Sequence, residues 1–298
     1  MVNRKGRIAT IIPARNEEKF IGKTLTALLN QQDIDNNHII VVNDGSEDRT
    51  KEIVNSFNNI ELINSANRGF NAQGTPLLAM VINLGLEKLS LQTQVNYDYI
   101  MILGSDHILP SHYIKKIVDL MDHNKDIAIC SGQISGEKSI VPRGSGRIVK
   151  TEFWKTIGLE YPLNFGFETY LLIKAQQLGY KIDILNDLVS YTSRPTRTSY
   201  KKETYISYGK SLRALGYSQL YSAARIGLIS LKNPKGAFYM LKGYTSNDIK
   251  LYENDVRNFL KIIQHKRIKN IFDKMSIIKF IVFSLYIIRN SVIISSFT

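Results

Sequence analysis

The chain has 298 residues, a formal net charge of +13 at pH 7 and a hydrophobic content of 44%, which is enough for a packed core and excludes a disordered chain. Its one cysteine, Cys130, excludes an intrachain disulfide and lies in an apolar run, as expected of a small core residue in a reducing compartment. The first apolar run is short and interrupted by Pro13 and Arg15, which argues against a signal peptide.

The positive charge is concentrated in the last third of the chain. Residues 201–298 contain 17 Lys and Arg against 5 Asp and Glu, a net charge of +12, whereas residues 1–200 contain 22 and 21, a net charge of +1. No RNA- or DNA-reading motif accompanies the basic part, so we expect no nucleic-acid partner. The split indicates an anionic surface that only the C-terminal part meets.

The first hundred residues alternate between strands and helices. Residues 8–12 form an apolar strand that Pro13 ends, and the helix after it has Ile21, Leu25 and Leu28 on one face. Residues 39–42 are a second buried strand. This order predicts a βαβα unit with a parallel strand pair.

The second strand ends abruptly in acidic and small residues. Asp44 would lie at the carboxyl end of a buried parallel strand, where open α/β sheets bind ligands. Ser46 is predicted to cap a helix that has Glu47 and Asp48 in its first turn. A surface turn that only connects strand to helix is the alternative interpretation of this segment taken alone.

The pattern continues through Met121. We expect a short strand over 60–63, a loop rich in Gly and Asn over 64–74, and a helix that ends near Leu89. A buried strand over 97–103 follows, and Pro110 begins the next helix.

These segments together resemble the family 2 glycosyltransferases of the GT-A fold, an inverting class. That family begins with a strand, a P-x-x-N-E turn and a helix that ends near Gln, followed by a strand and D-D-G-S-x-D. Asn43 replaces the first Asp of that pair. The matching residues are Pro13, Asn16, Glu17, Gln31, Asp44, Gly45, Ser46 and Asp48.

The resemblance covers residues 7–195 and implies a Rossmann-like α/β domain. Its sheet would be mixed and mostly parallel, with helices on both sides. We therefore expect a GT-A catalytic domain over residues 1–200 and a basic helical region over 201–298.

The resemblance also implies a site for a nucleotide-sugar donor such as a UDP- or GDP-sugar. Asp44 would accept a hydrogen bond from the base, and Arg68 would meet the diphosphate, although a solvated loop cation is an equal interpretation of Arg68. The residues implied to bind the nucleotide are Pro13, Ala14, Arg15, Glu17, Asp44, Arg68 and Ser105.

A family D-x-D motif aligns with the end of the strand over 97–103. Gly104 stands at its first Asp and Asp106 at its last. Asp106 would hold Mg²⁺ or Mn²⁺ against the donor diphosphate, or else cap a helix. His107 is a candidate second metal ligand, with a solvated loop histidine as the alternative.

The acceptor side of the resemblance lies further along the chain. Gly144 and Gly146 would let the backbone approach the sugar closely. Glu168 matches the first residue of an acidic pair, but Thr169 replaces the second, which is often assigned as the general base. Glu168 either takes the acceptor proton or only stabilises a helix N-terminus.

An acceptor that is already an anion, such as a polyprenyl phosphate, needs no base. Arg194 and Arg197 are placed to meet a diphosphate or such an acceptor, and a glycan hydroxyl is the other acceptor class. The apolar span 277–294 is interrupted by Lys279 and Arg289, so it indicates an interfacial helix better than a transmembrane one. A last helix packed on the core is the alternative.

The sequence therefore predicts an inverting, metal-dependent glycosyltransferase at the cytoplasmic face of a membrane. A sugar nucleotidyltransferase is one rival, but it would show a glycine-rich basic loop where this chain has the acidic PARNEE segment. A non-catalytic nucleotide-sugar-binding protein of the same fold is the other, suggested by Gly104 and Thr169.

Overall fold

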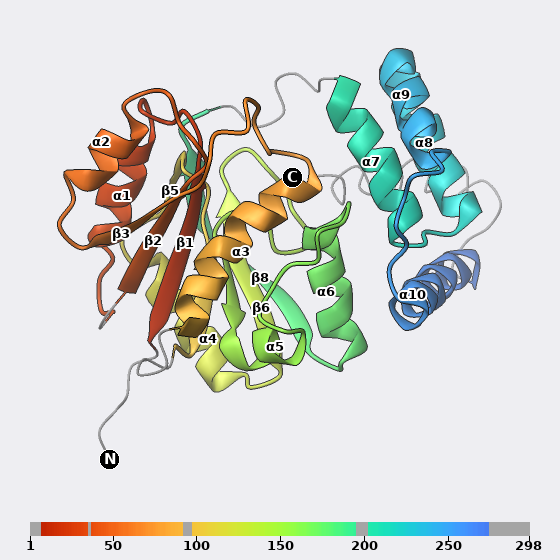
Figure 1. The fold of residues 1–298 in the computed structure, drawn as a ribbon. Coiled ribbons are helices and arrows are strands. Elements are labelled where there is room, and N and C mark those ends of the chain that lie inside the picture. Colours follow the sequence, from red (N-terminus) through yellow and green to blue (C-terminus); the bar gives the residue numbers. More distant parts are fainter. Residues whose placement is uncertain (1–6, 35–36, 92–96, 195–201, 274–298) are drawn as a thin grey trace. The chain divides into compact units, whose positions relative to one another are not determined.

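The computed structural model describes residues 7–34, 37–91, 97–194 and 202–273 (Figure 1). Its contacts divide the chain into two compact units. The sheet unit comprises Met1–Gln73, Leu77–Leu163 and Gly179–Thr196. The helical unit comprises Gly74–Pro76, Asn164–Leu178 and Arg197–Thr298.

The sheet unit is built on one mixed sheet, in the order β3-β2-β1-β4-β7-β6-β8-β5. The pairs β1–β2, β1–β4, β2–β3 and β6–β8 are parallel, whereas β7 pairs antiparallel with β4 and β6, and β5 pairs antiparallel with β8. This mixed, mostly parallel α/β arrangement confirms the expected fold class. The strands are β1 (Ile8–Ala14), β2 (Asn37–Asn43), β3 (Ile60–Asn64), β4 (Tyr99–Ile102), β5 (His107–Ile108), β6 (Ile127–Ile134), β7 (Arg147–Lys150) and β8 (Lys181–Thr192).

Helices cover both faces of this sheet, as Figure 1 shows with α1 and α2 on one side and α3 on the other. Ile8 and Ile12 of β1 belong to a buried cluster with residues of α1, α2 and α4. Ile11 points to the opposite face, where a Cβ added at Gly85 of α3 would lie 2.7 Å from its side chain. The helices are α1 (Ile21–Leu29), α2 (Thr50–Asn55), α3 (Pro76–Leu91), α4 (Tyr113–His123) and α5 (Thr151–Thr156).

The helix after β2 begins later than predicted. It starts at Thr50, and no side chain caps it from its N-cap residue Arg49. Ser46 accepts the backbone N–H of Asn16 at 3.0 Å, so the prediction that Ser46 caps this helix is wrong. Asp48 takes over part of that role, because one oxygen of its carboxylate accepts the N–H of Thr50 at 3.0 Å.

Strand register brings the motif residues to one edge of the sheet. Ala14 of β1 lies beside Asn43 of β2, and Ile11 lies beside Ile102 of β4, so the chain leaves all three strands at the same edge. Because parallel strands end together, the turns after β1, β2 and β4 are neighbours. The end of β8 joins them, since Thr192 pairs with His107 in β5.

The helical unit packs aromatic side chains between its helices. Tyr170 and Tyr252 stack with ring centroids 4.5 Å apart, and both belong to one buried cluster with Tyr205 and Met240. The helices are α6 (Phe167–Gln177), α7 (Lys202–Ala214), α8 (Gln219–Lys232), α9 (Pro234–Tyr244) and α10 (Asn254–Asp273).

Across residues 7–34, 37–91, 97–194 and 202–273, every helix is too short or too polar to cross a bilayer. The predicted interfacial span 277–294 lies outside the described residues, and so does Arg197.

Candidate active site

The two N-terminal motifs bind each other at the sheet edge. The backbone N–H of Asn16 donates to Ser46, and the Asn16 side chain accepts the N–H of Glu47 at 2.9 Å. The N–H of Glu18 donates to the Asp48 carboxylate at 3.0 Å. Asn16 has a positive φ of 54°, which Asn tolerates better than most residues. These motif residues therefore hold the two turns together.

Asp44 lies buried at the start of its turn, with 3% of its surface exposed. Its backbone N–H donates to the carbonyl of Ala14 at 2.8 Å, which ties the turn after β2 to the end of β1. The Ser65 hydroxyl donates to Oδ1 of its carboxylate at 3.1 Å, and Arg68 forms an ion pair with the same oxygen. Arg68 is therefore no solvated loop cation.

A second arginine completes this cluster. Arg15 donates to the carbonyl of Asp44 and to the side-chain oxygen of Asn67, the latter at 2.7 Å. The structure thus brings together Asp44, Arg15 and Arg68, three of the residues predicted to bind the nucleotide. Pro13 and Ala14 form the last two positions of the adjacent strand β1.

A second cluster joins two carboxylates through one guanidinium. Arg194, just past the end of β8, donates from Nε to Oδ2 of Asp106 at 2.8 Å and from one terminal nitrogen to Oε1 of Glu17 at 2.9 Å. The guanidinium also lies 5.0 Å from the ring centroid of Phe20. Glu17 and Arg194 are 177 positions apart in the sequence, so only the fold brings them together.

Burial and charge act against each other in this cluster. Burial raises the pKa of Glu17 above its ordinary value, because the low-dielectric surroundings disfavour the carboxylate more than Arg194 stabilises it. Burial also disfavours the charged form of Arg194, but the hydrogen bonds and charges of Asp106 and Glu17 outweigh it and raise the pKa of the guanidinium. Arg194 is therefore a permanent cation at this site.

The turn that presents Asp106 is held from several sides. The Thr24 hydroxyl of α1 donates to the carbonyl of buried Ser105 at 2.9 Å, and the N–H of Ser193 donates to the carbonyl of Asp106 at 2.8 Å. The helix after this turn, α4, has His112 as its N-cap and no side-chain cap. The alternative that Asp106 caps this helix is wrong.

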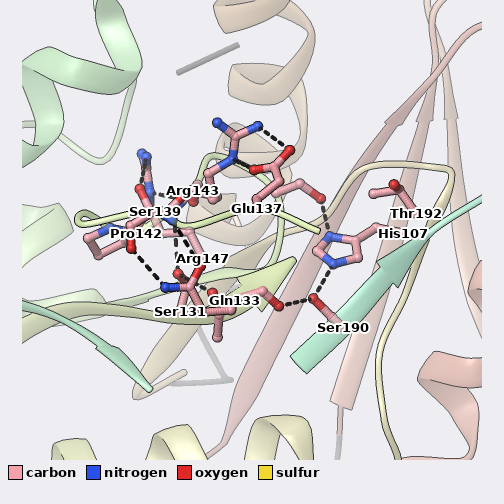
Figure 2. Close-up of polar contacts among 12 residues, drawn as sticks. His107, Ser131, Gln133, Glu137, Ser139, Pro142, Arg143, Arg147, Ser190 and Thr192 are labelled. Carbon is pink, nitrogen blue, oxygen red and sulfur yellow. Dashed lines mark hydrogen bonds and ion pairs between the residues drawn. The ribbon is translucent and has the colours of Figure 1, made fainter. Parts of the chain in front are cut away.

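His107 lies inside the sheet unit with none of its surface exposed. The interpretation of a solvated loop histidine is wrong. Its Nδ1 lies 2.6 Å from the Ser145 hydroxyl and its Nε2 lies 2.7 Å from the Ser190 hydroxyl, so both ring nitrogens have protein partners. Burial lowers the pKa of His107 to about 4, which keeps the imidazole neutral. Figure 2 shows the ring bonded to Ser190, which in turn bonds to Gln133.

The glycines of the predicted acceptor loop differ in their surroundings. Gly146 has a φ of +79°, and a Cβ there would lie 2.8 Å from the hydroxyl of Tyr113 and 3.0 Å from His107. Close packing of these two rings therefore explains why residue 146 is glycine. Gly144 lies in the same loop, partly exposed.

Glu168 belongs to the helical unit. It lies in the first turn of α6, whose N-cap is Gly166 with a φ of 77°, and it is partly buried. A carboxylate in this position is stabilised by the positive end of the helix dipole. Glu168 stays a predicted base.

The match to a family model decides the assignment. The model described as "Glycosyl transferase family 2" matches residues 9–169, more than half of the chain. The chain belongs to glycosyl transferase family 2. The matched range begins in β1 and ends just after Glu168.

Curated relatives within this family share parts of the sequence. Chondroitin synthase of Escherichia coli is 28% identical over 125 residues, which are 41% of this chain and 16% of that protein. The probable glycosyltransferase YdaM of Bacillus subtilis is 50% identical over 52 residues, 17% of this chain and 12% of that protein. The chain therefore matches less than a fifth of the length of each relative.

Solved structures of glycosyltransferases share the fold. One is the mannosyltransferase PcManGT of Pyrobaculum calidifontis in complex with GDP-Man and Mn²⁺, with a TM-score of 0.56 at 13% identity. The match covers 99% of this chain and 86% of the PcManGT chain. TarS 1-349 of S. aureus with UDP-GlcNAc has a TM-score of 0.52 at 18% identity, covering 85% and 78%. At these identities the likeness shows the fold alone.

A divalent metal fits this family 2 site in one way only. Among the described residues, no three His, Cys, Asp or Glu side chains gather closely enough to enclose an ion. Gly104 supplies no carboxylate, and a Cβ there would lie 3.0 Å from the Ser145 hydroxyl. Mg²⁺ sites commonly use one or two carboxylates plus substrate phosphates, and Asp106 suits that mode. His107 does not, because both its nitrogens already bind hydroxyls.

The sequence analysis does not predict three serines that hold the site together, Ser65, Ser145 and Ser190. Ser65 follows the carboxyl end of β3, so the rule that drew attention to Asp44 also applies to it. Ser145 and Ser190 have no such local signal, since their partner His107 is 38 and 83 positions away.

Proposed function

We propose that this chain transfers a sugar from a nucleotide-diphospho-sugar to an acceptor, with inversion at the anomeric carbon. The observation that supports this most is the pair of clusters at one sheet edge: Asp44 between two arginines, and Asp106 bridged to Glu17 by Arg194. A sugar–nucleotide diphosphate requires a carboxylate that recognises the base, cations that meet the diphosphate, and a second carboxylate near the leaving group.

The donor is assigned to the first cluster through its base. Ser65 and Arg68 both bind Oδ1 of Asp44, so we assign Oδ2 to the hydrogen bond from the base edge. Arg15 and Arg68 face the same turn and are assigned to the diphosphate. UDP- and GDP-sugars are the donors we propose, because TarS and PcManGT were solved with UDP-GlcNAc and GDP-Man.

Asp106 and Arg194 are assigned to the leaving diphosphate. When bound, Mg²⁺ or Mn²⁺ would neutralise the charge that develops on the leaving group. Asp106 is the residue that would hold it. Arg194 is already a fixed cation beside Asp106, so it adds a second positive group for the diphosphate oxygens.

The acceptor is either a glycan hydroxyl or a polyprenyl phosphate. For a hydroxyl, Glu168 would take the proton as the anomeric carbon is attacked. A phosphate needs no base, and Arg194 and Arg197 would bind it instead. The basic C-terminal region suits a site of action at the cytoplasmic face of an anionic membrane, which we propose for the second acceptor class.

Two variants test the donor assignment. Thermal shift with UDP-, GDP- and dTDP-sugars identifies the donor, because ligand at 100 times its Kd stabilises a protein by about 2.7 kcal/mol. We expect Asp44→Ala to abolish that shift with or without Mn²⁺.

We expect Asp106→Asn to keep the melting temperature and lose most transfer, an effect that EDTA should reproduce in the wild type.

The product that is released separates the alternatives. Release of free nucleoside diphosphate by the wild type distinguishes an enzyme from a protein that only binds nucleotide-sugars. Release of pyrophosphate from a nucleoside triphosphate and a sugar phosphate would instead support the sugar nucleotidyltransferase. Full transfer by Asp106→Asn in the presence of chelator would contradict the metal assignment.

A further inference from the structure

A chain of hydrogen bonds runs through His107 from the acidic turn to strand β8. The Gly104 N–H lies 2.8 Å from the Ser145 hydroxyl, which lies 2.6 Å from Nδ1 of His107. Nε2 lies 2.7 Å from the Ser190 hydroxyl, which lies 2.9 Å from the carbonyl of Gln133. Each of its side chains comes from a different segment of the sheet unit.

The two ends of this chain determine which ring nitrogen must carry a proton. The carbonyl of Gln133 can only accept, so Ser190 uses its single proton there. Ser190 must then accept from Nε2, which therefore holds the imidazole proton. In this Nε2–H tautomer, Nδ1 is the acceptor for the Ser145 hydroxyl. The Gly104 N–H can only donate, and it donates to the same hydroxyl.

We propose that His107 is a positioning residue for the proposed transfer, in the Nε2–H form, joining the turn of Asp106 to the strand that ends before Arg194. Its own backbone N–H donates to the carbonyl of Gly104 at 3.2 Å, so both peptide groups of Gly104 depend on His107 or its partner Ser145. On the other side, Ser190 lies four positions before Arg194 in the same segment.

The hydrogen bonds through His107 determine the contact between Asp106 and Arg194. The carboxylate comes from the turn and the guanidinium from the end of β8, and they meet at 2.8 Å. A misplacement of about 1 Å at a reacting centre can cost about 10²-fold in rate. The ring nitrogens of His107 bind Ser145 and Ser190, so its hydrogen bonds act on Asp106 and Arg194 through the two segments that it joins.

The first test reads the tautomer directly. ¹⁵N-histidine labelling of the full chain should show a proton on Nε2 of His107 at pH 7. A ring protonated at Nδ1 alone would overturn the proposal. This measurement needs no donor or acceptor, so it decides the tautomer even if the chain proves to transfer no sugar.

The second test follows the Arg194 side chain. The Nε–H resonance of Arg194, which reports its bond to Asp106, should shift in Ser190→Ala, Ser145→Ala and His107→Phe. Ser131→Ala is the matched control, since Ser131 is another fully buried serine and lies outside this chain of bonds. Unchanged Arg194 resonances in all three variants would overturn the positioning role.

The third test separates positioning from stability. We expect His107→Phe and Ser190→Ala to lower kcat about 10- to 10²-fold with the donor KM changed less than about threefold. His107→Gln, whose amide can still donate toward Ser190, should recover part of kcat. The proposal would be contradicted if kcat fell only in proportion to the melting temperature in all variants, Ser131→Ala included. Such a result would show a structural role alone.

Discussion

Asp106 lies beside one cation in the structure and is proposed to hold another. Arg194 occupies its Oδ2 and at the same time holds Glu17, so one positive charge is shared by two carboxylates. A divalent ion bound through Asp106 would share its carboxylate with this guanidinium, so the two positive charges would repel each other. The Asp106 side chain therefore links metal affinity to the position of Arg194, and donor phosphates are a natural second partner for both cations.

Removing Arg194 should make metal binding easier. We expect Arg194→Ala to bind Mn²⁺ about tenfold more tightly without nucleotide, since a charge-assisted hydrogen bond contributes about 1.5–3 kcal/mol and 1.4 kcal/mol is tenfold in affinity. Electron paramagnetic resonance of free Mn²⁺ measures this. Arg49→Ala, at an exposed ion pair, is the control. Equal or weaker Mn²⁺ binding by Arg194→Ala would count against the competition.

At the scale of an element, the Asp48 carboxylate helps to hold the start of α2. Asp48 accepts the N–H of Thr50 and the N–H of Glu18, so it fixes the helix start and also the turn after β1. Burial works against its ionisation, but the hydrogen bonds from Thr50 and Glu18 outweigh burial and lower the pKa of Asp48. The motif Asp therefore has a structural function in the second turn.

This lowered pKa gives a pH-dependent prediction. Asp48→Ala should cost about 1 kcal/mol of unfolding free energy at neutral pH, the usual effect of losing a capping side chain. Because the folded pKa lies below the unfolded value of 3.8, the contribution is present above that value and disappears as pH falls through the folded pKa. Urea melts at pH 7 and at pH 3 should show the difference between the two proteins shrink.

A matched control is available on the same helix. Glu52→Ala removes an exposed carboxylate with 72% of its side chain accessible, so it should change stability little at either pH. An Asp48→Ala deficit that is the same at both pH values would contradict the role assigned to the charge.

At the scale of the whole molecule, charge is divided between two parts of the chain. Residues 201–298 have a net charge of +12. The donor contacts proposed here all come from the sheet unit. Membrane binding and donor binding should therefore be separable.

Deletion of residues 275–298 tests this separation. We expect the full chain to sediment with anionic liposomes, less so as salt rises, because each basic residue near the surface contributes about 1 kcal/mol and salt screens it. The shortened chain should stay in the supernatant and keep its thermal shift with nucleotide-sugar. Vesicles of neutral lipid are the control. A shortened chain that aggregates, from a parent that never binds vesicles, would mean that the segment packs on the protein core.

The sequence by itself determined the alternation of strands and helices, the sheet edge and the donor-side motif, because buried strands and the turns at their ends have local patterns. A local pattern predicts Asp44, and the resemblance to the family D-x-D motif predicts Asp106. Only the tertiary structure decided what these carboxylates contact. Arg194 reaches Glu17 across 177 positions, and His107 reaches Ser190 across 83. Such pairs leave no periodicity, since they depend on strand order and register, which bring distant turns to one edge.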